Sequence, residues 1–198
     1  MNVSPDAPWS GLRPHQVAAE LEGLRSPWWI CGGWAIDLWL GGLSRSHADT
    51  DIGVFRSDVP ALREVLAGWE LFAAHEGELT PLRASKPEPH VTSLWCRRET
   101  TGPWDVQVMI DEADDELWRF RRDPTVTRPV REITWVSERG IPALRPEIQL
   151  LYKAKDVRER DQADFDAVVA SLDPPARAWL AGALATVHPG HMWLTSLG

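Results

Sequence analysis

Cysteine, tyrosine and long apolar runs are all scarce in this sequence of 198 residues. The two cysteines, Cys31 and Cys96, are too few for a disulfide framework or a cysteine-rich zinc site, and both lie in apolar segments, so we expect two buried thiols. No apolar run approaches the roughly 20 residues of a membrane-spanning helix. The first residues also lack the charged and apolar regions of a signal peptide, and we therefore expect a cytoplasmic protein without a membrane partner.

Basic residues are in deficit. The chain has 21 Lys and Arg against 29 Asp and Glu, which gives a net charge of -8 at pH 7. General nucleic-acid binders present a basic surface to the phosphate backbone, so this balance argues against a nucleic-acid partner and favours a small or cationic one. Tryptophan, in contrast, is abundant, with twelve residues against one tyrosine. That much indole predicts a sizeable core and an aromatic wall to a pocket.

The order of hydrophobic patterns predicts a mixed α/β (α+β) fold. After a lead-in that we expect to be mobile (1–11), strand-like patterns occur at Trp28–Cys31, Asp49–Phe55, Trp69–Ala74, His90–Arg97, Trp104–Ile110 and Ile133–Val136. Helical patterns begin near Pro14, cover Trp34–Leu40 and Asp58–Gly68, and dominate from Pro146 to Val187. We expect a mixed β-sheet core with flanking helices over residues 1–140 and a C-terminal helical bundle over residues 141–198.

A pair of glycines, Gly32 and Gly33, separates an apolar run from a short helix. Glycine lets a ligand approach the backbone, and the free N–H groups at a helix N-terminus favour phosphate. The pair matches neither the P-loop nor the spaced-glycine dinucleotide motif. On its own it is equally compatible with a plain turn.

Two carboxylates, Asp49 and Asp51, follow about one loop later. If both lie on a strand, their side chains share a face because side chains alternate along a strand. Two neighbouring carboxylates repel each other and destabilise the fold unless a cation lies between them. Carboxylate oxygens are suitable ligands for a hard metal ion. A solvated strand edge would explain the pair alone. With the glycine turn upstream, the pair predicts a site for a metal-bound nucleotide.

The string Gly32-Gly33-Trp34, followed by Asp49-Thr50-Asp51, resembles the signature of the polymerase-β-like nucleotidyltransferase superfamily. The longer strings Gly-Gly-Trp-Ala-Ile-Asp and Arg-Ser-His-Ala-Asp-Thr-Asp-Ile resemble its aminoglycoside 2″-adenylyltransferase-like branch, as do segments 118–123, 146–153 and 161–165. The resemblance extends from about Trp28 to Trp193. It implies a nucleotidyltransferase catalytic domain in residues 1–140 that transfers NMP, most simply AMP from ATP, to a hydroxyl of a small-molecule acceptor. An aminoglycoside-like antibiotic is one candidate acceptor.

The resemblance also implies two Mg²⁺ ions and a set of ligands for them. Asp49 and Asp51 match the family's metal-binding pair, and the superfamily adds a third carboxylate from a neighbouring strand. We expect Asp105 to be that carboxylate, as a ligand of the second metal, a general base or both, because alternation along Trp104–Ile110 places it opposite the apolar face. Asp111 is the reserve candidate.

The nucleotide contacts follow from the same resemblance. We expect Gly32, Gly33 and Trp34 to bind phosphate through backbone N–H groups, since Trp34 replaces a serine that many superfamily members carry there. Arg45 and Lys153 are the expected phosphate counter-charges, although Lys153 would also fit an ordinary surface helix. His47 is expected to orient Asp49 or to lie on the surface. Asp37 is expected to pair with Arg45, reach the acceptor or have a structural role.

Two alternatives stay open. Some relatives of this fold are toxins that modify tRNA or protein, and the acidic balance argues mildly against tRNA. The other alternative is a catalytically degenerate module that binds nucleotide without turnover, which would apply if Asp105 points away from the aspartate pair. The expected partners are a nucleoside triphosphate and a small-molecule acceptor, and the protein is expected to be a monomer or a homodimer.

Overall fold

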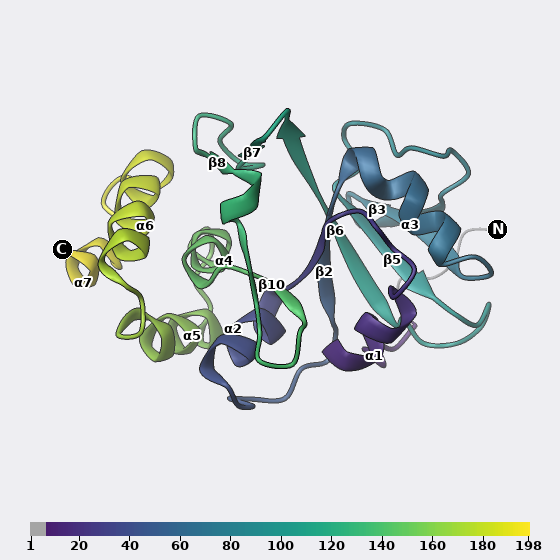
Figure 1. Cartoon of the computed structure of the whole chain (residues 1–198), viewed down its shortest axis with the longest axis horizontal. Coiled ribbons are helices and arrows are strands. Elements are labelled where there is room, and N and C mark those ends of the chain that lie inside the picture. The colour runs from purple at the N-terminus through teal and green to yellow at the C-terminus, as the bar shows by residue number, and fades with distance from the viewer. Residues whose placement is uncertain (1–6) are drawn as a thin grey trace.

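A computed structural model describes residues 7–198, and its centre is a ten-stranded mixed sheet (Figure 1). The strand order is β4-β3-β5-β6-β2-β1-β10-β9, with β7 paired to β6 and β8 paired to β7. The strands are β1 (Trp28–Cys31), β2 (Asp51–Phe55), β3 (Glu70–His75), β4 (Glu78–Pro81), β5 (Ser93–Arg97), β6 (Val106–Asp114), β7 (Leu117–Arg119), β8 (Thr127–Pro129), β9 (Thr134–Val136) and β10 (Pro142–Leu144).

Seven α-helices and two 3-10 helices are present in the described part of the chain. They are α1 (Pro14–Glu20), α2 (Gly32–Leu40), α3 (Val59–Val65), α4 (Pro146–Lys153), α5 (Glu159–Val169), α6 (Pro174–Val187), α7 (Leu194–Leu197), η1 (Arg56–Asp58) and η2 (Val130–Glu132). The helices α4 to α7 lie together at one end of the molecule, and α2 packs against α4 and α5 (Figure 1). No helix within residues 7–198 combines the length and the apolar character needed to cross a membrane.

The sheet separates two hydrophobic clusters. One contains Val17 of α1 and Leu62 of α3 together with Ile52 and Val108 of the central strands. The other contains side chains of the C-terminal helices, such as Phe165, together with Trp29 of β1 and Phe55 of β2. Along β1, Trp29 and Cys31 enter the second cluster and Ile30 enters the first, as a sheet covered on both faces requires. The expected mixed α/β fold is confirmed.

Most element positions agree with the sequence patterns, and the differences are local. The helical pattern predicted up to Val187 ends with α6 (Pro174–Val187), where the Asp173 side chain accepts a hydrogen bond from the Ala176 N–H at 2.8 Å. The segment between the predicted strands Trp69–Ala74 and His90–Arg97 contains a further strand, β4. The region after residue 140 is not helical throughout, because β10 pairs with β1 and β9 before α4 begins. Cys31 and Cys96 are buried free thiols, as expected.

The segment Trp9–Leu12 pairs with the sheet, so the prediction of a mobile lead-in is wrong for these residues; residues 1–6 lie outside the described part. Ser10 and Leu12 N–H donate to the carbonyls of Trp104 and Asp105, each at 2.9 Å. On its other side, the Gly11 N–H donates to the Ala48 carbonyl at 3.4 Å and the Thr50 hydroxyl donates to the Leu12 carbonyl. The segment therefore lies between the residues that precede β2 and those that precede β6.

A β-bulge at the start of β6 overturns the expected facing of Asp105. Val106 is paired with Cys96, and the Asp105 N–H also donates to the Cys96 carbonyl at 2.9 Å, so two residues oppose one. The extra residue reverses the alternation. Trp95 is the cross-strand partner of Gln107, so the two side chains lie on the same face of the sheet. Trp104 packs against Trp95 and therefore lies on that face, and Asp105 does not.

Candidate functional site

A cavity of about 430 Å³ opens where β1 and β2 meet the N-terminal turn of α2 and the facing ends of α4 and α5. It brings together six of the residues predicted from sequence: Gly32, Gly33, Arg45, Asp49, Asp51 and Lys153. Trp34 and Asp105 do not line it. The predicted glycine turn, aspartate pair and counter-charges thus form one site, although they come from distant parts of the chain.

The glycine turn is in close contact with the charged residues around it. Gly32 has φ +68°, a backbone conformation that glycine adopts without strain, and a Cβ atom there would overlap the carboxylate of Asp51. A Cβ atom on Gly33 would overlap the guanidinium of Arg45 and the ring of His47. Both positions therefore need glycine to bring the start of α2 against these side chains.

The two carboxylates are close enough to affect each other. Burial, and then the charge of Asp49, raises the pKa of Asp51 to about 7, while Lys153 and Arg160 act in the opposite direction. Asp49 itself is exposed and lies just before β2. No group of three or more His, Cys, Asp or Glu residues within 7–198 is arranged to hold a metal ion. The pair fits an ion such as Mg²⁺, which proteins often hold by one or two carboxylates plus substrate phosphates.

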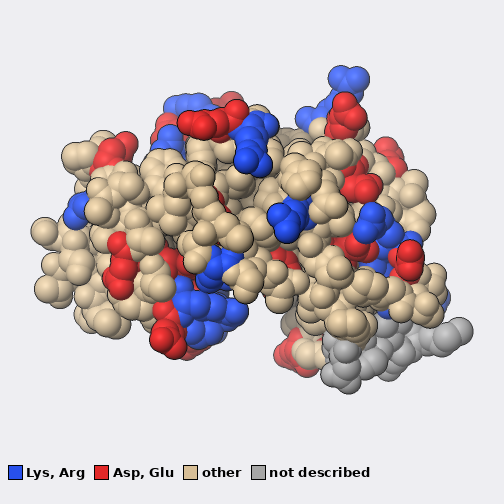
Figure 2. All heavy atoms as spheres, turned by 90° about the horizontal axis from the view of Figure 1, so that it is seen from below, with Lys and Arg blue, Asp and Glu red and all other residues tan. Residues whose placement is uncertain are grey.

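Basic side chains outnumber acidic ones around this cavity, although the whole chain is acidic. Six lining residues are basic and four are acidic: Arg45, Arg122, Lys153, Lys155, Arg158 and Arg160 against Asp49, Asp51, Asp156 and Asp161. The space-filling view from below shows Lys and Arg atoms gathered beside acidic atoms on this side of the molecule (Figure 2). The local charge favours a polyanionic ligand that carries its own cation.

Lys153 is buried rather than on a surface helix. Its Nζ lies 2.8 Å from Asp164 Oδ2 and 3.1 Å from Asp161 Oδ1, and the residue is 9% exposed. Arg45 Nη2 lies 3.4 Å from the same Asp164 oxygen. The two predicted counter-charges are thus held in place by one carboxylate of α5. This arrangement fixes both cations at the cavity wall before any ligand binds.

His47 pairs with Asp37 and not with Asp49. The His47 Nε2 lies 2.6 Å from Asp37 Oδ2, and Asp37 Oδ1 accepts from the Ser44 N–H at 3.1 Å. The ring nitrogen Nδ1 lies 3.0 Å from Arg45 Nη1. The Trp34 ring lies against the same imidazole with a centroid distance of 4.4 Å. Of the three expected roles of Asp37, these contacts support the structural one: Asp37 holds the loop that leads to the aspartate pair and does not pair with Arg45.

Neither candidate for the third carboxylate lines the cavity. Asp105 accepts hydrogen bonds from the Arg98 N–H at 2.9 Å and from its guanidinium at 2.8 and 3.1 Å. Asp111 is buried and accepts from the Tyr152 hydroxyl at 2.7 Å. Burial raises the pKa of Asp111, and the Tyr152 hydrogen bond opposes that shift. In the register of the parallel strands, the residue beside Asp51 on β6 is Gln107.

Several lining residues were not predicted, among them Gln149 and Tyr152 of α4, Arg158 at the N-cap of α5 and Arg160 of α5. Gln149, Tyr152 and Lys153 are spaced three and four residues apart, so they share one face of α4. That spacing was available in the sequence as an extension of the Lys153 prediction. The Gln149 Oε1 accepts a hydrogen bond from the Gly32 N–H at 2.7 Å, which links α4 directly to the glycine turn.

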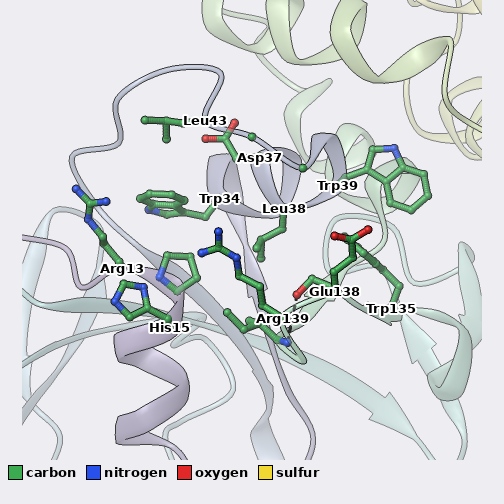
Figure 3. Close-up of a pocket in the computed structure, with 15 residues that line it drawn as sticks. Arg13, His15, Trp34, Asp37, Leu38, Trp39, Leu43, Trp135, Glu138 and Arg139 are labelled. Carbon is green, nitrogen blue, oxygen red and sulfur yellow. Dashed lines mark hydrogen bonds between the residues drawn. The ribbon is translucent and has the colours of Figure 1, made fainter.

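A second cavity, of about 480 Å³, lies beside α2 (Figure 3). Three indoles contribute to its wall, and its charged residues come from the N-cap of α1, from α2 and from the β9–β10 connection: Trp34, Trp39, Trp135, Arg13, Asp37, Glu138 and Arg139. The predicted aromatic wall is therefore present, but not in the cavity of the aspartate pair. Trp34 lines the second cavity and His47 the first, and their rings meet at an angle of 32°, so they form part of the layer between the two cavities.

The fold and the site can be compared with solved structures. A lincosamide antibiotic adenylyltransferase with bound lincomycin matches with a TM-score of 0.58 at 18% identity, over 83% of this chain and 99% of that one. ANT(2″)-Ia in complex with adenylyl-2″-tobramycin matches with a TM-score of 0.52 at 16% identity, over 87% of this chain and 95% of that one. At these identities the two likenesses show a shared fold.

Sequence comparison identifies the family of this chain. A 2″-aminoglycoside nucleotidyltransferase of Klebsiella pneumoniae is 42% identical over 57 residues, and one of Escherichia coli is 40% identical over 57 residues. Each match spans 27% of this chain and 32% of the relative. The family model described as aminoglycoside-2″-adenylyltransferase matches residues 14–168, which include the glycine turn, the aspartate pair and Lys153. The chain belongs to the aminoglycoside-2″-adenylyltransferase family.

Proposed function

We propose that this protein is a nucleotidyltransferase that binds a Mg²⁺-nucleoside triphosphate in the first cavity and transfers NMP, most simply AMP from ATP, to a hydroxyl of a small-molecule antibiotic. One observation carries the proposal. A helix N-terminus, the carboxylates of Asp49 and Asp51 and six basic side chains line the same cavity. This combination suits a triphosphate with its metal, because the helix and the cations attract phosphate and the carboxylates attract the metal.

Each group has a proposed part in binding. The Gly33 and Trp34 N–H groups are among the first of α2, so they have no partner within the helix and are free for phosphate oxygens. Asp49 and Asp51 would hold Mg²⁺ together with those oxygens, and the ion would offset the charge that develops on the leaving pyrophosphate. Arg45 and Lys153 neutralise phosphate charge from positions that Asp164 already fixes.

The acceptor is proposed from two relatives and from the charge of the cavities. The matched structures contain lincomycin in one case and an adenylylated tobramycin in the other, so an antibiotic hydroxyl is the first acceptor to test. Basic residues exceed acidic ones in the first cavity, which disfavours a polycation close to the phosphates. A lincosamide therefore belongs in the acceptor panel beside aminoglycosides.

A second candidate function follows from the position of Asp105. Its carboxylate is engaged with Arg98, and Gln107 stands beside Asp51 on the neighbouring strand. A site without a third carboxylate would bind the metal-nucleotide and turn it over slowly or not at all. This candidate is a nucleotide-binding module that retains the fold of the family.

The test is calorimetric titration of ATP and the other NTPs, with and without Mg²⁺, into the wild type and Asp49→Asn. We expect metal-dependent binding that the substitution weakens at least tenfold, because the ion loses one of two protein ligands. Absence of NTP binding to the folded wild type would refute both candidate functions. Pyrophosphate release in the presence of the acceptor panel then separates them, since only the transferase releases it.

A further inference from the structure

The side chain of Gln149 has two ends with different surroundings. It lies on α4, is 6% exposed and lines the first cavity. Its Oε1 accepts a hydrogen bond from the Gly32 N–H at 2.7 Å across 117 residues of sequence. A backbone N–H can only donate, so this contact settles which end of the amide is oxygen.

The other end of the amide has no hydrogen-bond partner among residues 7–198. None of the hydrogen bonds within residues 7–198 uses the Gln149 Nε2, and this nitrogen is not among the buried polar atoms that lack a partner. It is therefore accessible from the cavity that Gln149 lines. An amide nitrogen carries two N–H donors and no acceptor, so it suits an oxygen-rich anion.

The hydrogen-bond donors at the glycine turn indicate what the Gln149 Nε2 could bind. The Gly32 N–H would be the first donor of α2 available to a phosphate, but Gln149 already occupies it. The same amide presents new N–H donors beside it. Gln149 thus exchanges one backbone donor for a side-chain donor and at the same time fixes the turn against α4, which also carries Lys153.

Glutamine is the residue that supplies both groups at once. An aliphatic side chain would leave the Gly32 N–H without its acceptor, and glutamate would satisfy that N–H but present a carboxylate oxygen where the amide has a donor. We propose that Gln149 is a phosphate-binding residue, whose Oε1 holds the Gly32 turn while its Nε2 donates to a phosphate oxygen of the nucleotide. This inference rests on the proposed function.

The test compares Gln149→Glu with Gln16→Glu. In α1, the Gln16 Oε1 accepts from the Arg13 N–H at 2.8 Å, so the control adds the same charge to the same kind of hydrogen bond away from the cavity. Titration of Mg²⁺-ATP should give a Kd at least tenfold higher for Gln149→Glu and a Kd within twofold of the wild type for Gln16→Glu. Both variants should keep the thermal unfolding midpoint of the wild type within a few degrees.

The outcomes separate the two proposals. A wild type that binds no NTP removes the proposed function and this inference together. A wild type that binds, with equal Kd for the two glutamate variants, overturns the role of Gln149 and leaves the proposed function intact. If Gln149→Glu does not fold, Gln149→Met replaces it, because it keeps the volume and removes both polar ends; wild-type affinity in that variant would equally overturn the inference.

Discussion

Lys153 Nζ lies 2.8 Å from Asp164 Oδ2, and this ion pair joins the last turn of α4 to the middle of α5. Asp161 approaches the same ammonium at 3.1 Å, so one buried cation serves two carboxylates that are 1% and 3% exposed. The pair belongs to the cavity wall and to the packing of the C-terminal helices at once. Binding and stability are therefore coupled at this position.

Substitution of Lys153 should destabilise the fold strongly. Lys153→Met leaves two buried carboxylates without their shared cation, and breaking such a group by removing one partner costs about 3 kcal/mol. The free energy of unfolding in urea measures the effect. Lys155→Met is the control, since the Lys155 ammonium is exposed and lies 3.9 Å from Asp156, and it should change stability by less than about 0.5 kcal/mol. Equal effects of the two variants would contradict the buried arrangement.

The stability should fall in acid through Asp161. Burial raises the pKa of Asp161, but the hydrogen bonds of Arg158 and Lys153 outweigh it and bring the pKa from 3.8 to about 2. Because the folded pKa is the lower one, this contribution is complete above about pH 4 and is lost as the pH falls towards 2; it amounts to about 2 kcal/mol.

Urea unfolding of the wild type and Asp161→Asn at pH 5 and pH 2.5 tests that dependence. The wild type should lose more stability between the two pH values than the variant does. Identical losses would show that Asp161 is not the titrating group.

The glycine turn should tolerate no side chain. Gly32→Ala combines a positive φ with overlap of the new Cβ and the Asp51 carboxylate, so we expect a loss of about 1–2 kcal/mol and weaker binding of Mg²⁺-ATP. Gly42→Ala is the matched control, because no atom lies within 4 Å of a Cβ atom built there. Urea unfolding and titration report the two effects. A Gly32→Ala protein indistinguishable from Gly42→Ala would refute the close contact with Asp51.

Asp105 should be dispensable for nucleotide binding. Asp105→Asn removes the charge that pairs with Arg98, a side chain that is 48% exposed, so we expect at most about 1 kcal/mol of lost stability. The affinity for Mg²⁺-ATP should stay within twofold of the wild type, whereas Asp51→Asn should lower it at least tenfold. Parallel titrations of the two variants are sufficient. If Asp105→Asn and Asp51→Asn lost affinity to a similar extent, Asp105 would have to be a metal ligand after all.

The local parts of the site could be predicted from sequence, and the parts that depend on distant contacts could not. The glycine turn and the aspartate pair are encoded by neighbouring residues, so their spacing was informative. Asp105 was misplaced because the bulge beside Cys96 is a property of strand pairing and leaves no mark on the alternation of apolar residues. The contact of Gln149 with Gly32 joins residues 117 positions apart, and no local pattern encodes it.

The N-terminal segment has a consequence for where the functional unit begins. The family match starts at residue 14, but Gly11 lies against the backbone of Asp49, where a Cβ atom would come within 2.8 Å of the Asp49 carbonyl carbon. The Leu12 carbonyl accepts a hydrogen bond from the hydroxyl of Thr50, which lies between Asp49 and Asp51 in the sequence. A chain trimmed to residues 14–168 would keep every predicted ligand and lose the segment that contacts Asp49 and Thr50. The part of the chain that holds the site therefore begins before residue 14, where the family match starts.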